Sequence, residues 1–187
     1  LNTLLQRGVF VLVVMLVSFG VGLSFAATLI FMVLSVFFWL WAFIGLRAYS
    51  QGQSPWGLQS AWSRMFLGVI LLVSGLLSMV WLRVYSQLGT QGFVYVLLVV
   101  SATDSGAYVF GRWLGHHSFA PRVSPNKTWE GFCGGLVAAS MVMALGIYFF
   151  NLPRNEWLQW LGLSYVVALV SIYGDLLVSM LKRIAGV

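Results

Sequence analysis

Two carboxylates, Asp104 and Asp175, interrupt long apolar stretches of this chain. An ionisable side chain inside an apolar span is costly, and it usually faces the interior of a helix bundle and has a function. Helical spacing places each acid on a face with further polar side chains, namely Ser101, Ser105 and Tyr108 for the first and Ser171, Ser179 and Lys182 for the second. Each span therefore carries a polar seam on a hydrophobic body.

The two acids also lie at a similar depth. Asp104 comes eight residues before Arg112, and Asp175 comes seven before Lys182. At 1.5 Å per residue, both carboxylates lie roughly 10 to 12 Å from the same boundary. If they face one cavity, a cation between them relieves their repulsion, and hard oxygen ligands suit Mg²⁺. The alternative is structural, with each acid bonded to a neighbouring helix or paired with Arg112, Lys182 or Arg183. The seams alone leave both interpretations open.

A polar segment, Ser124-Pro125-Asn126-Lys127-Thr128-Trp129-Glu130-Gly131, stands between apolar runs. Ser124 followed by Pro125 predicts an N-cap with proline at the first helical position. The start of that helix would bind an anion through free N–H groups, and Lys127 and Thr128 would add a cation and a hydroxyl donor. The spacing of a Walker A loop is absent. A capped helix start beside a lysine explains the same residues without a ligand.

His116 and His117 precede this segment and invite a metal interpretation. The sequence has no second ligand pair at a zinc-like spacing, so we interpret both as surface or headgroup-facing side chains. Gly131 and Gly135 form a Gly-x-x-x-Gly pattern, which predicts the close approach of another helix.

The composition of the 187 residues indicates an integral membrane protein. Hydrophobic residues make up 60% and charged residues 7% of the chain, and the mean hydropathy is +0.94, far from a soluble domain. From Gly8 to Leu46 no charged side chain occurs over 39 residues, about twice the roughly 20 that cross a bilayer, so we expect two spans with a turn near residues 18–24. Further apolar runs cover residues 65–82, 92–111, 129–150 and 157–178. The predicted fold is all-α, a polytopic transmembrane helix bundle of about six spans.

Basic residues divide unequally between the two sides of such a bundle. With six spans, eight lie on one side and only Arg83 and Arg154 on the other, and positively charged loops stay preferentially in the cytoplasm. A single long first helix would give seven against three, so we prefer six spans, with both termini and the polar segment in the cytoplasm. The net charge of +6 is scattered over one face, which favours contact with anionic membrane lipids and argues against nucleic acid.

The motifs follow one another as Asp104-Ser105-Gly106-Ala107-Tyr108, Gly111 and Gly115, the segment from Ser124 to Gly131, Gly174-Asp175-Leu176 and Ser179-x-Leu181-Lys182-Arg183. From about residue 95 onward this order closely resembles the bacterial phosphatidate cytidylyltransferase (CDP-diacylglycerol synthase) family. The resemblance implies an enzyme of the bacterial inner membrane that converts CTP and phosphatidic acid to CDP-diacylglycerol and pyrophosphate. It also implies Mg²⁺, alone or with a second cation, and is compatible with a homodimer.

The resemblance further implies roles for individual residues. Asp175 is expected to be a metal ligand and, with Lys182 and Arg183, a catalytic residue, the two cations holding phosphates. The expected pocket residues are Ser124, Lys127, Thr128 and Glu130 around the nucleotide or phosphate, Ser179 beside the metal ligand, and Asp104 and Tyr108 on the neighbouring helix.

The chain departs from the family pattern at its end. After Lys182 and Arg183 the family continues with a Lys-Asp pair and a Pro-x-His-Gly-Gly-x-x-Asp-Arg-x-Asp segment that supplies further acidic ligands, whereas this sequence stops at Val187. We therefore expect residues 1–90 to form N-terminal transmembrane helices and residues 91–187 an incomplete catalytic region. A fragment of this kind is expected to show no turnover by itself.

Two other functions compete with this interpretation. A CTP-dependent polyprenol or phytol kinase shares the membrane setting and the nucleotide, and label from the α- or γ-phosphate of CTP distinguishes the two enzymes. A small transporter or ion-binding membrane protein would use the two acids to carry protons or ions, but it leaves Lys127-Thr128 unexplained.

Overall fold

The computed structural model describes residues 4–22, 24–53, 57, 60–85 and 89–186. The helices are α1 (Leu4–Gly22), α2 (Phe25–Ser50), α3 (Ala61–Tyr85), α4 (Gly89–Leu114), α5 (Trp129–Phe150) and α6 (Trp157–Ala185), with a short 3-10 helix η1 (Arg154–Glu156) before α6. Within the described residues, five helices, α2 to α6, are long and apolar enough to cross a membrane, and the apolar part of α1, Arg7–Gly20, is shorter. The predicted all-α polytopic bundle is confirmed.

The first apolar stretch divides into two helices, as expected. Ser24 has an extended backbone (φ −124°, ψ 122°) and caps α2, because its hydroxyl accepts a hydrogen bond from the N–H of Ala27 at 3.4 Å. Such a cap provides a partner for one of the N–H groups that the first turn of a helix leaves unbonded. Residue 23 lies outside the described residues.

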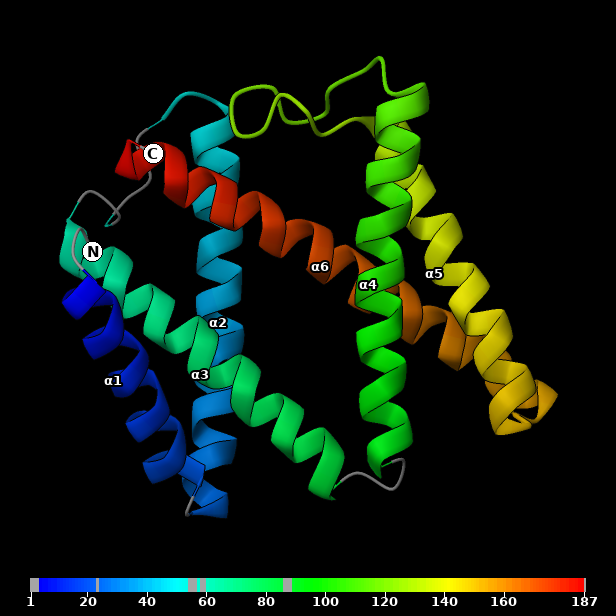
Figure 1. The fold of residues 1–187 in the computed structure, drawn as a ribbon, viewed down its shortest axis with the longest axis horizontal. Coiled ribbons are helices and arrows are strands. Elements are labelled where there is room, and N and C mark those ends of the chain that lie inside the picture. The colour runs from blue at the N-terminus through cyan, green and yellow to red at the C-terminus, as the bar shows by residue number, and fades with distance from the viewer. Residues whose placement is uncertain (1–3, 23, 54–56, 58–59, 86–88, 187) are drawn as a thin grey trace.

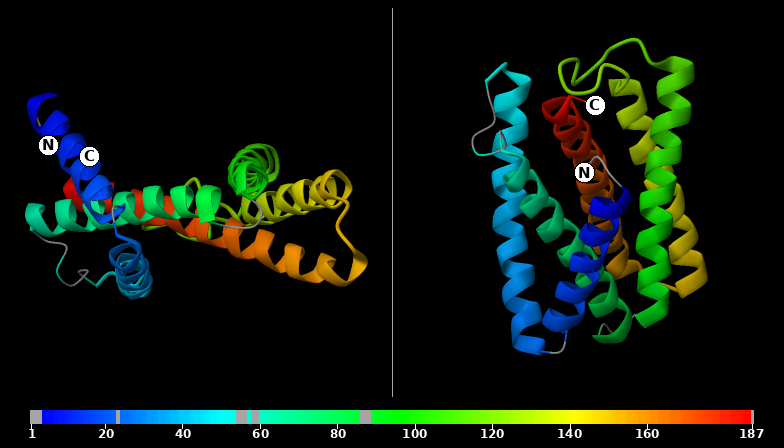
Figure 2. Two further views of the ribbon diagram at one scale, coloured as in Figure 1. Left: turned by 90° about the horizontal axis from the view of Figure 1, so that it is seen from below. Right: turned by 60° about the vertical axis from the view of Figure 1, so that its left-hand side comes forward.

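The helices run alternately between two ends of the bundle (Figures 1 and 2). In Figure 1, α2, α4 and α6 finish at the end that holds the α4–α5 loop (residues 115–128), and α5 begins there. We call this the loop end. Arg83 lies in the last turn of α3 and Arg154 begins η1, so these two basic residues lie at the opposite end. The helix directions therefore separate the basic residues as the six-span prediction requires.

Glycine residues bring α4 and α5 close together. A Cβ added at Gly106 of α4 would lie 2.6 Å from the carbonyl oxygen of Gly134 and 2.7 Å from the Cβ of Ala138. A Cβ added at Gly131 of α5 would lie 2.7 Å from the carbonyl oxygen of Ala107. Small residues thus fix the spacing between the two helices, as the Gly-x-x-x-Gly pattern predicts.

Buried residues hold the centre of the α4–α5 loop. Ala120 and Val123 are 8% and 2% exposed, and they belong to a hydrophobic cluster with Leu176, Leu177 and Met180 of α6. The same cluster continues into α2 and α3. The loop therefore packs over the C-terminal part of α6 and has a defined position.

The Ser124-Pro125 pair predicts the start of α5, and this prediction is wrong. The helix begins at Trp129, and its N-cap is Thr128, whose hydroxyl accepts a hydrogen bond from the N–H of Gly131 at 3.1 Å. Thr128 is extended (φ −115°, ψ 155°) and forms an isolated antiparallel bridge with Ser118. Pairing with the first arm of the loop keeps the chain extended up to Thr128, so the helix starts later than the local sequence signal indicates.

Candidate functional site

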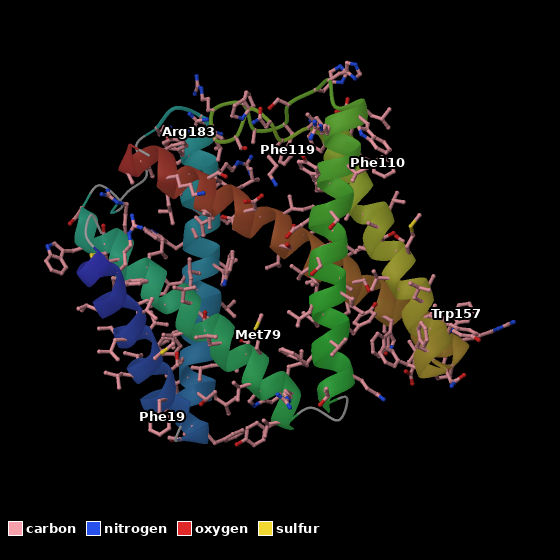
Figure 3. All side chains as sticks on the ribbon, in the orientation of Figure 1. Phe19, Met79, Phe110, Phe119, Trp157 and Arg183 are labelled. Carbon is pink, nitrogen blue, oxygen red and sulfur yellow. The ribbon has the colours of Figure 1, made fainter. Side chains whose placement is uncertain are left out.

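A cavity of about 820 Å³ lies at the loop end, between α4, α5, α6 and the α4–α5 loop. Ligand pockets commonly enclose roughly 300 to 1,000 Å³, so its size suits a nucleotide. The walls come from one face of α4, both arms of the loop, the first turn of α5, and Ile172 and Asp175 of α6. Phe119, which lies below the loop in Figure 3, belongs to the loop wall.

The α4 wall follows from helical periodicity. Its residues Asp104, Ala107, Tyr108, Gly111 and Arg112 are spaced three, four, seven and eight residues from the first. Asp104 and Tyr108 were expected on this wall from the sequence. Arg112 reaches back along it, because its Nη1 donates a hydrogen bond to the phenolic oxygen of Tyr108 at 2.8 Å.

Lys127 and Asp175 form an ion pair that joins the loop to α6. Their side chains are 27% and 51% exposed, so water and ligands can reach the pair. The loop holds Lys127 in place, since its N–H donates to the carbonyl oxygen of Ser124 at 3.1 Å and its own carbonyl accepts from the N–H of Phe119 at 3.1 Å. Ser124 lies outside the described lining of the cavity, and its contribution is to position Lys127 through the backbone.

Asp104 is held from α6. Its Oδ1 accepts a hydrogen bond from the hydroxyl of Ser171 at 3.2 Å. Both acids that the sequence singles out therefore line one cavity, and each is tied to a second element. The hydrogen bond from Ser171 to Asp104 is the contact with a neighbouring helix that the structural alternative allows. In the described part of the chain neither acid is paired with Arg112, Lys182 or Arg183, and the partner of Asp175 is Lys127.

Asp104 and Asp175 are the cavity residues that could bind the metal ion expected from the sequence. Within the described residues, no group of three or more His, Cys, Asp and Glu side chains is arranged to hold a metal ion. Mg²⁺ is usually bound through one or two carboxylates and completes its octahedral coordination with water and phosphate oxygens. Asp104 and Asp175 supply two carboxylates to the cavity wall, and one oxygen of Asp175 is paired with Lys127, so the magnesium site stays a prediction.

Thr128 lines the cavity at the start of α5. Its hydroxyl accepts the capping hydrogen bond from Gly131, and because that bond leaves the hydroxyl proton unused, the group can still donate to an anion. A Cβ added at Gly111 or Gly115 would lie 3.3 or 2.8 Å from Thr128 Oγ1. Glycine near the end of α4 and at the first residue after it therefore lets this segment approach the start of α5.

Glu130 lies outside the described lining of the cavity, although the sequence places it in the pocket. Its Oε1 lies 2.8 Å from Nδ1 of His117, and its Oε2 accepts from the N–H of His117 at 3.4 Å. With the hydrogen bond from the N–H of Trp129 to the carbonyl oxygen of His117 at 2.9 Å, this pair closes the base of the loop. Residues 13 apart across a loop share no helical spacing, so the sequence does not predict the pair.

Ser179, Lys182 and Arg183 also lie outside the described lining. Lys182 shares a helical face with Asp175, but it is seven residues, or roughly 10 Å, further along the axis. The loop packs over this part of α6, and Nε of Arg183 donates to the carbonyl oxygen of Val123 at 3.3 Å. Figure 3 shows Arg183 beside the loop at the loop end. The roles of Lys182 and Arg183 in holding phosphate, and of Ser179 beside the metal ligand, stay predictions.

Several other residues of the cavity wall were not expected in the site from the sequence. The sequence indicates Arg112 only as a boundary residue and a possible ion-pair partner, although it lies four residues after Tyr108 on one helical face. The wall also contains His116, which we interpreted as a surface side chain, and Ser118. Such loop positions follow no periodic pattern, and only the folded loop brings them to the cavity.

The fold and the cavity define a polytopic helical membrane protein. Its polar site combines the carboxylates of Asp104 and Asp175 with the basic side chains of Lys127 and Arg112. The chain belongs to the cytidylyltransferase family, because the sequence model of that family matches residues 2–187. This finding confirms the resemblance noted from the motifs.

Individual relatives match the chain over part of their length. The phosphatidate cytidylyltransferase of Staphylococcus aureus strain COL is 41% identical over 99 residues, which cover 53% of this chain and 38% of the relative. Those of Staphylococcus haemolyticus strain JCSC1435 and Staphylococcus epidermidis strain RP62A are 41% and 40% identical with the same coverage. The chain thus aligns with less than two fifths of these curated relatives. No solved structure matches it.

Proposed function

We propose that the chain is part of a phosphatidate cytidylyltransferase, which transfers a cytidylyl group from CTP to phosphatidic acid. The observation that carries the proposal is the meeting of Lys127, Asp104 and Asp175 in one cavity of a cytidylyltransferase family member. The excess of basic residues at the loop end supports an orientation in the bacterial inner membrane in which the cavity opens to the cytoplasm, where CTP is found.

In the proposed reaction, a phosphate oxygen of phosphatidic acid attacks the α-phosphorus of CTP. The new P–O bond gives CDP-diacylglycerol, while the bond from the α-phosphorus to the bridging oxygen breaks and pyrophosphate leaves. Such transfers depend mainly on positioning and on neutralising the charge of the phosphate oxygens. Mg²⁺ held by Asp104 and Asp175 would supply part of that neutralisation.

The side chains of the cavity supply the rest. Lys127 brings an ammonium group to the phosphate oxygens, and Asp175 orients that group through the ion pair. The hydroxyl of Thr128 donates a hydrogen bond to the same anion. Lys182 and Arg183, exposed at the loop end, add positive potential that attracts CTP to this side of the membrane.

The test uses the complete product of the gene in mixed micelles with phosphatidic acid, Mg²⁺ and CTP labelled at the α- or the γ-phosphate. Label from the α-phosphate is expected in the lipid fraction. Label from the γ-phosphate alone would indicate a CTP-dependent kinase, and ion or proton flux in proteoliposomes without any need for CTP would indicate a transporter. Either result would overturn the proposal.

Two variants connect the activity to the cavity. Lys127→Ala is expected to lower kcat/KM by about 100-fold or more, the usual loss when a group that stabilises developing charge is removed. Arg154→Ala removes a cation at the opposite end of the bundle, so it should keep nearly full activity. Equal activities of the two variants would contradict the assignment of Lys127.

A further inference from the structure

Arg112 brings to the cavity a positive charge that no acid neutralises among the described residues. The ion pairs in that part of the chain are Lys127 with Asp175 and His117 with Glu130. The hydrogen-bond partner of the guanidinium is the neutral phenol of Tyr108, at 2.8 Å from Nη1. Four of the five guanidinium N–H donors are thus left for a ligand.

The location of Arg112 suits a ligand that arrives from the bilayer. It lies in the last turn of α4, at the level where a spanning helix meets the headgroups. Its neighbour Trp113 is 78% exposed, which is typical of an aromatic side chain at the membrane interface. Tyr108, 63% exposed, lies one turn deeper on the same wall. This wall therefore joins the interfacial end of α4 to the carboxylate of Asp104.

Different elements of the cavity wall carry different chemistry. Lys127 belongs to the loop and is already engaged with Asp175 of α6, whereas Arg112 and Tyr108 belong to α4. A guanidinium is a planar fork that binds two oxygens of a phosphate at once, while an ammonium acts as a point charge. The phenol of Tyr108 accepts a hydrogen bond from Arg112 and keeps its own proton to donate.

We propose that Arg112, with Tyr108, binds the terminal phosphate of the lipid acceptor at the α4 wall of the cavity. The inference rests on the proposed function and assigns the acceptor lipid a subsite separate from the Lys127–Asp175 pair. Two N–H groups of Arg112 bind two phosphate oxygens, and the hydroxyl of Tyr108 donates to the same group. A third phosphate oxygen then points into the cavity, toward the nucleotide. The same chemistry would recognise free phosphate or the phosphates of CTP, so the test must separate these sources.

The test measures equilibrium binding to the complete product of the gene in detergent. The ligands are dioctanoyl phosphatidic acid, dioctanoyl phosphatidylcholine, inorganic phosphate and CTP. Arg112→Ala is expected to weaken binding of phosphatidic acid at least about tenfold, as the loss of charged hydrogen bonds predicts, and to change CTP affinity less than about twofold. Arg112→Lys keeps the charge and loses the fork, so it should also weaken phosphatidic acid. Tyr108→Phe should produce a smaller loss.

Arg47→Ala is the matched control. Arg47 is also an exposed arginine in the last turn of a loop-end helix, but it lies outside the described lining of the cavity. Its removal should leave the affinity for phosphatidic acid unchanged. The elution volume and melting temperature of each variant show whether it is folded, and if Arg112→Ala is not, Arg112→Lys decides.

Several results would overturn the subsite. These are unchanged binding of phosphatidic acid by the folded Arg112 variants, an equal loss in Arg47→Ala, an equal loss of CTP affinity, or inorganic phosphate competing as strongly as the lipid. The transfer assay separates this inference from the proposed function. If the variants lose lipid binding selectively but the protein transfers no α-label, the subsite is retained and the proposed enzyme activity is rejected. If α-label is transferred and Arg112→Lys has an unchanged KM for phosphatidic acid, the enzyme activity is retained and the subsite is rejected.

Discussion

Replacing Gly106 with alanine tests whether the close packing of α4 on α5 holds the cavity walls in place. The added Cβ would lie 2.6 Å from the carbonyl oxygen of Gly134 and 2.7 Å from the Cβ of Ala138. Carbon atoms in ordinary contact are about 3.5 to 4.0 Å apart, so the helices must separate locally by roughly 1 Å. Both obstacles are backbone or Cβ atoms, which cannot turn away by changing rotamer.

The expected magnitude follows from two opposing effects. Overpacking a close contact costs about 1 to 3 kcal/mol, whereas alanine in place of glycine favours a helix by up to about 1 kcal/mol. With the full helix gain, the net loss in the free energy of unfolding relative to wild type is about 0 to 2 kcal/mol, and relative to a helical glycine-to-alanine change without the close contact it is about 1 to 3 kcal/mol. For a chain of this size the second figure corresponds to a melting temperature about 2 to 12 °C below that of such a control.

The assay is thermal unfolding in detergent, followed by tryptophan fluorescence and by the monodisperse fraction on size exclusion. Gly162→Ala is the matched control, because Gly162 lies in helix α6 and a Cβ added there would have no atom within 4 Å. This variant should melt at or above the wild-type temperature. If Gly106→Ala melts no lower than Gly162→Ala, the close α4–α5 contact does not determine stability and the reasoning fails.

Three further outcomes are expected. Thr128→Ala should lower the free energy of unfolding by about 1 kcal/mol, because it removes the cap on α5. Thr128→Ser keeps the capping oxygen and should melt close to wild type. Equal melting temperatures for the two variants would contradict the capping role. Glu130→Gln should change CTP affinity by less than about twofold, because the partner of Glu130 is the exposed His117. A tenfold loss of CTP affinity would show that Glu130 takes part in binding the nucleotide. Chelation of divalent cations should abolish transfer by the complete gene product but leave phosphatidic acid binding at Arg112 unchanged, and transfer that survives chelation would exclude the proposed metal.

Helical periodicity explains why part of the site was predictable. Asp104 and Tyr108 lie on one face because residues spaced by three and four meet on a helix, and apolar flanks show that this face is inside a span. The two acids share a depth because a helix rises by a constant distance per residue. The break before Ser24 and the close approach at Gly131 follow from equally local rules.

The rest of the site depends on the α4–α5 loop, where no such period operates. The pairing of Ser118 with Thr128 moves the start of α5, and it also brings Lys127 to Asp175. Lys182 shares a face with Asp175, but the loop packs over the helix between them through Val123. Residues that share a helical face point in the same direction from the helix axis, and this much the spacing predicts. Only tertiary packing decides where along that axis the cavity ends.

In the proposed reaction, the charges of the cavity would require a further cation. Formally, Asp104 and Asp175 cancel Lys127 and Arg112, so the lining of described residues is close to neutral before any ligand enters. Two phosphate-bearing substrates would then repel each other in a low-dielectric setting, where charges are weakly screened. The proposed subsites at Lys127 and Arg112 would bind one substrate each, but they would not supply net positive charge. Mg²⁺ held by Asp104 and Asp175 would supply that charge for the transfer step, whereas lipid binding at Arg112 would not depend on it.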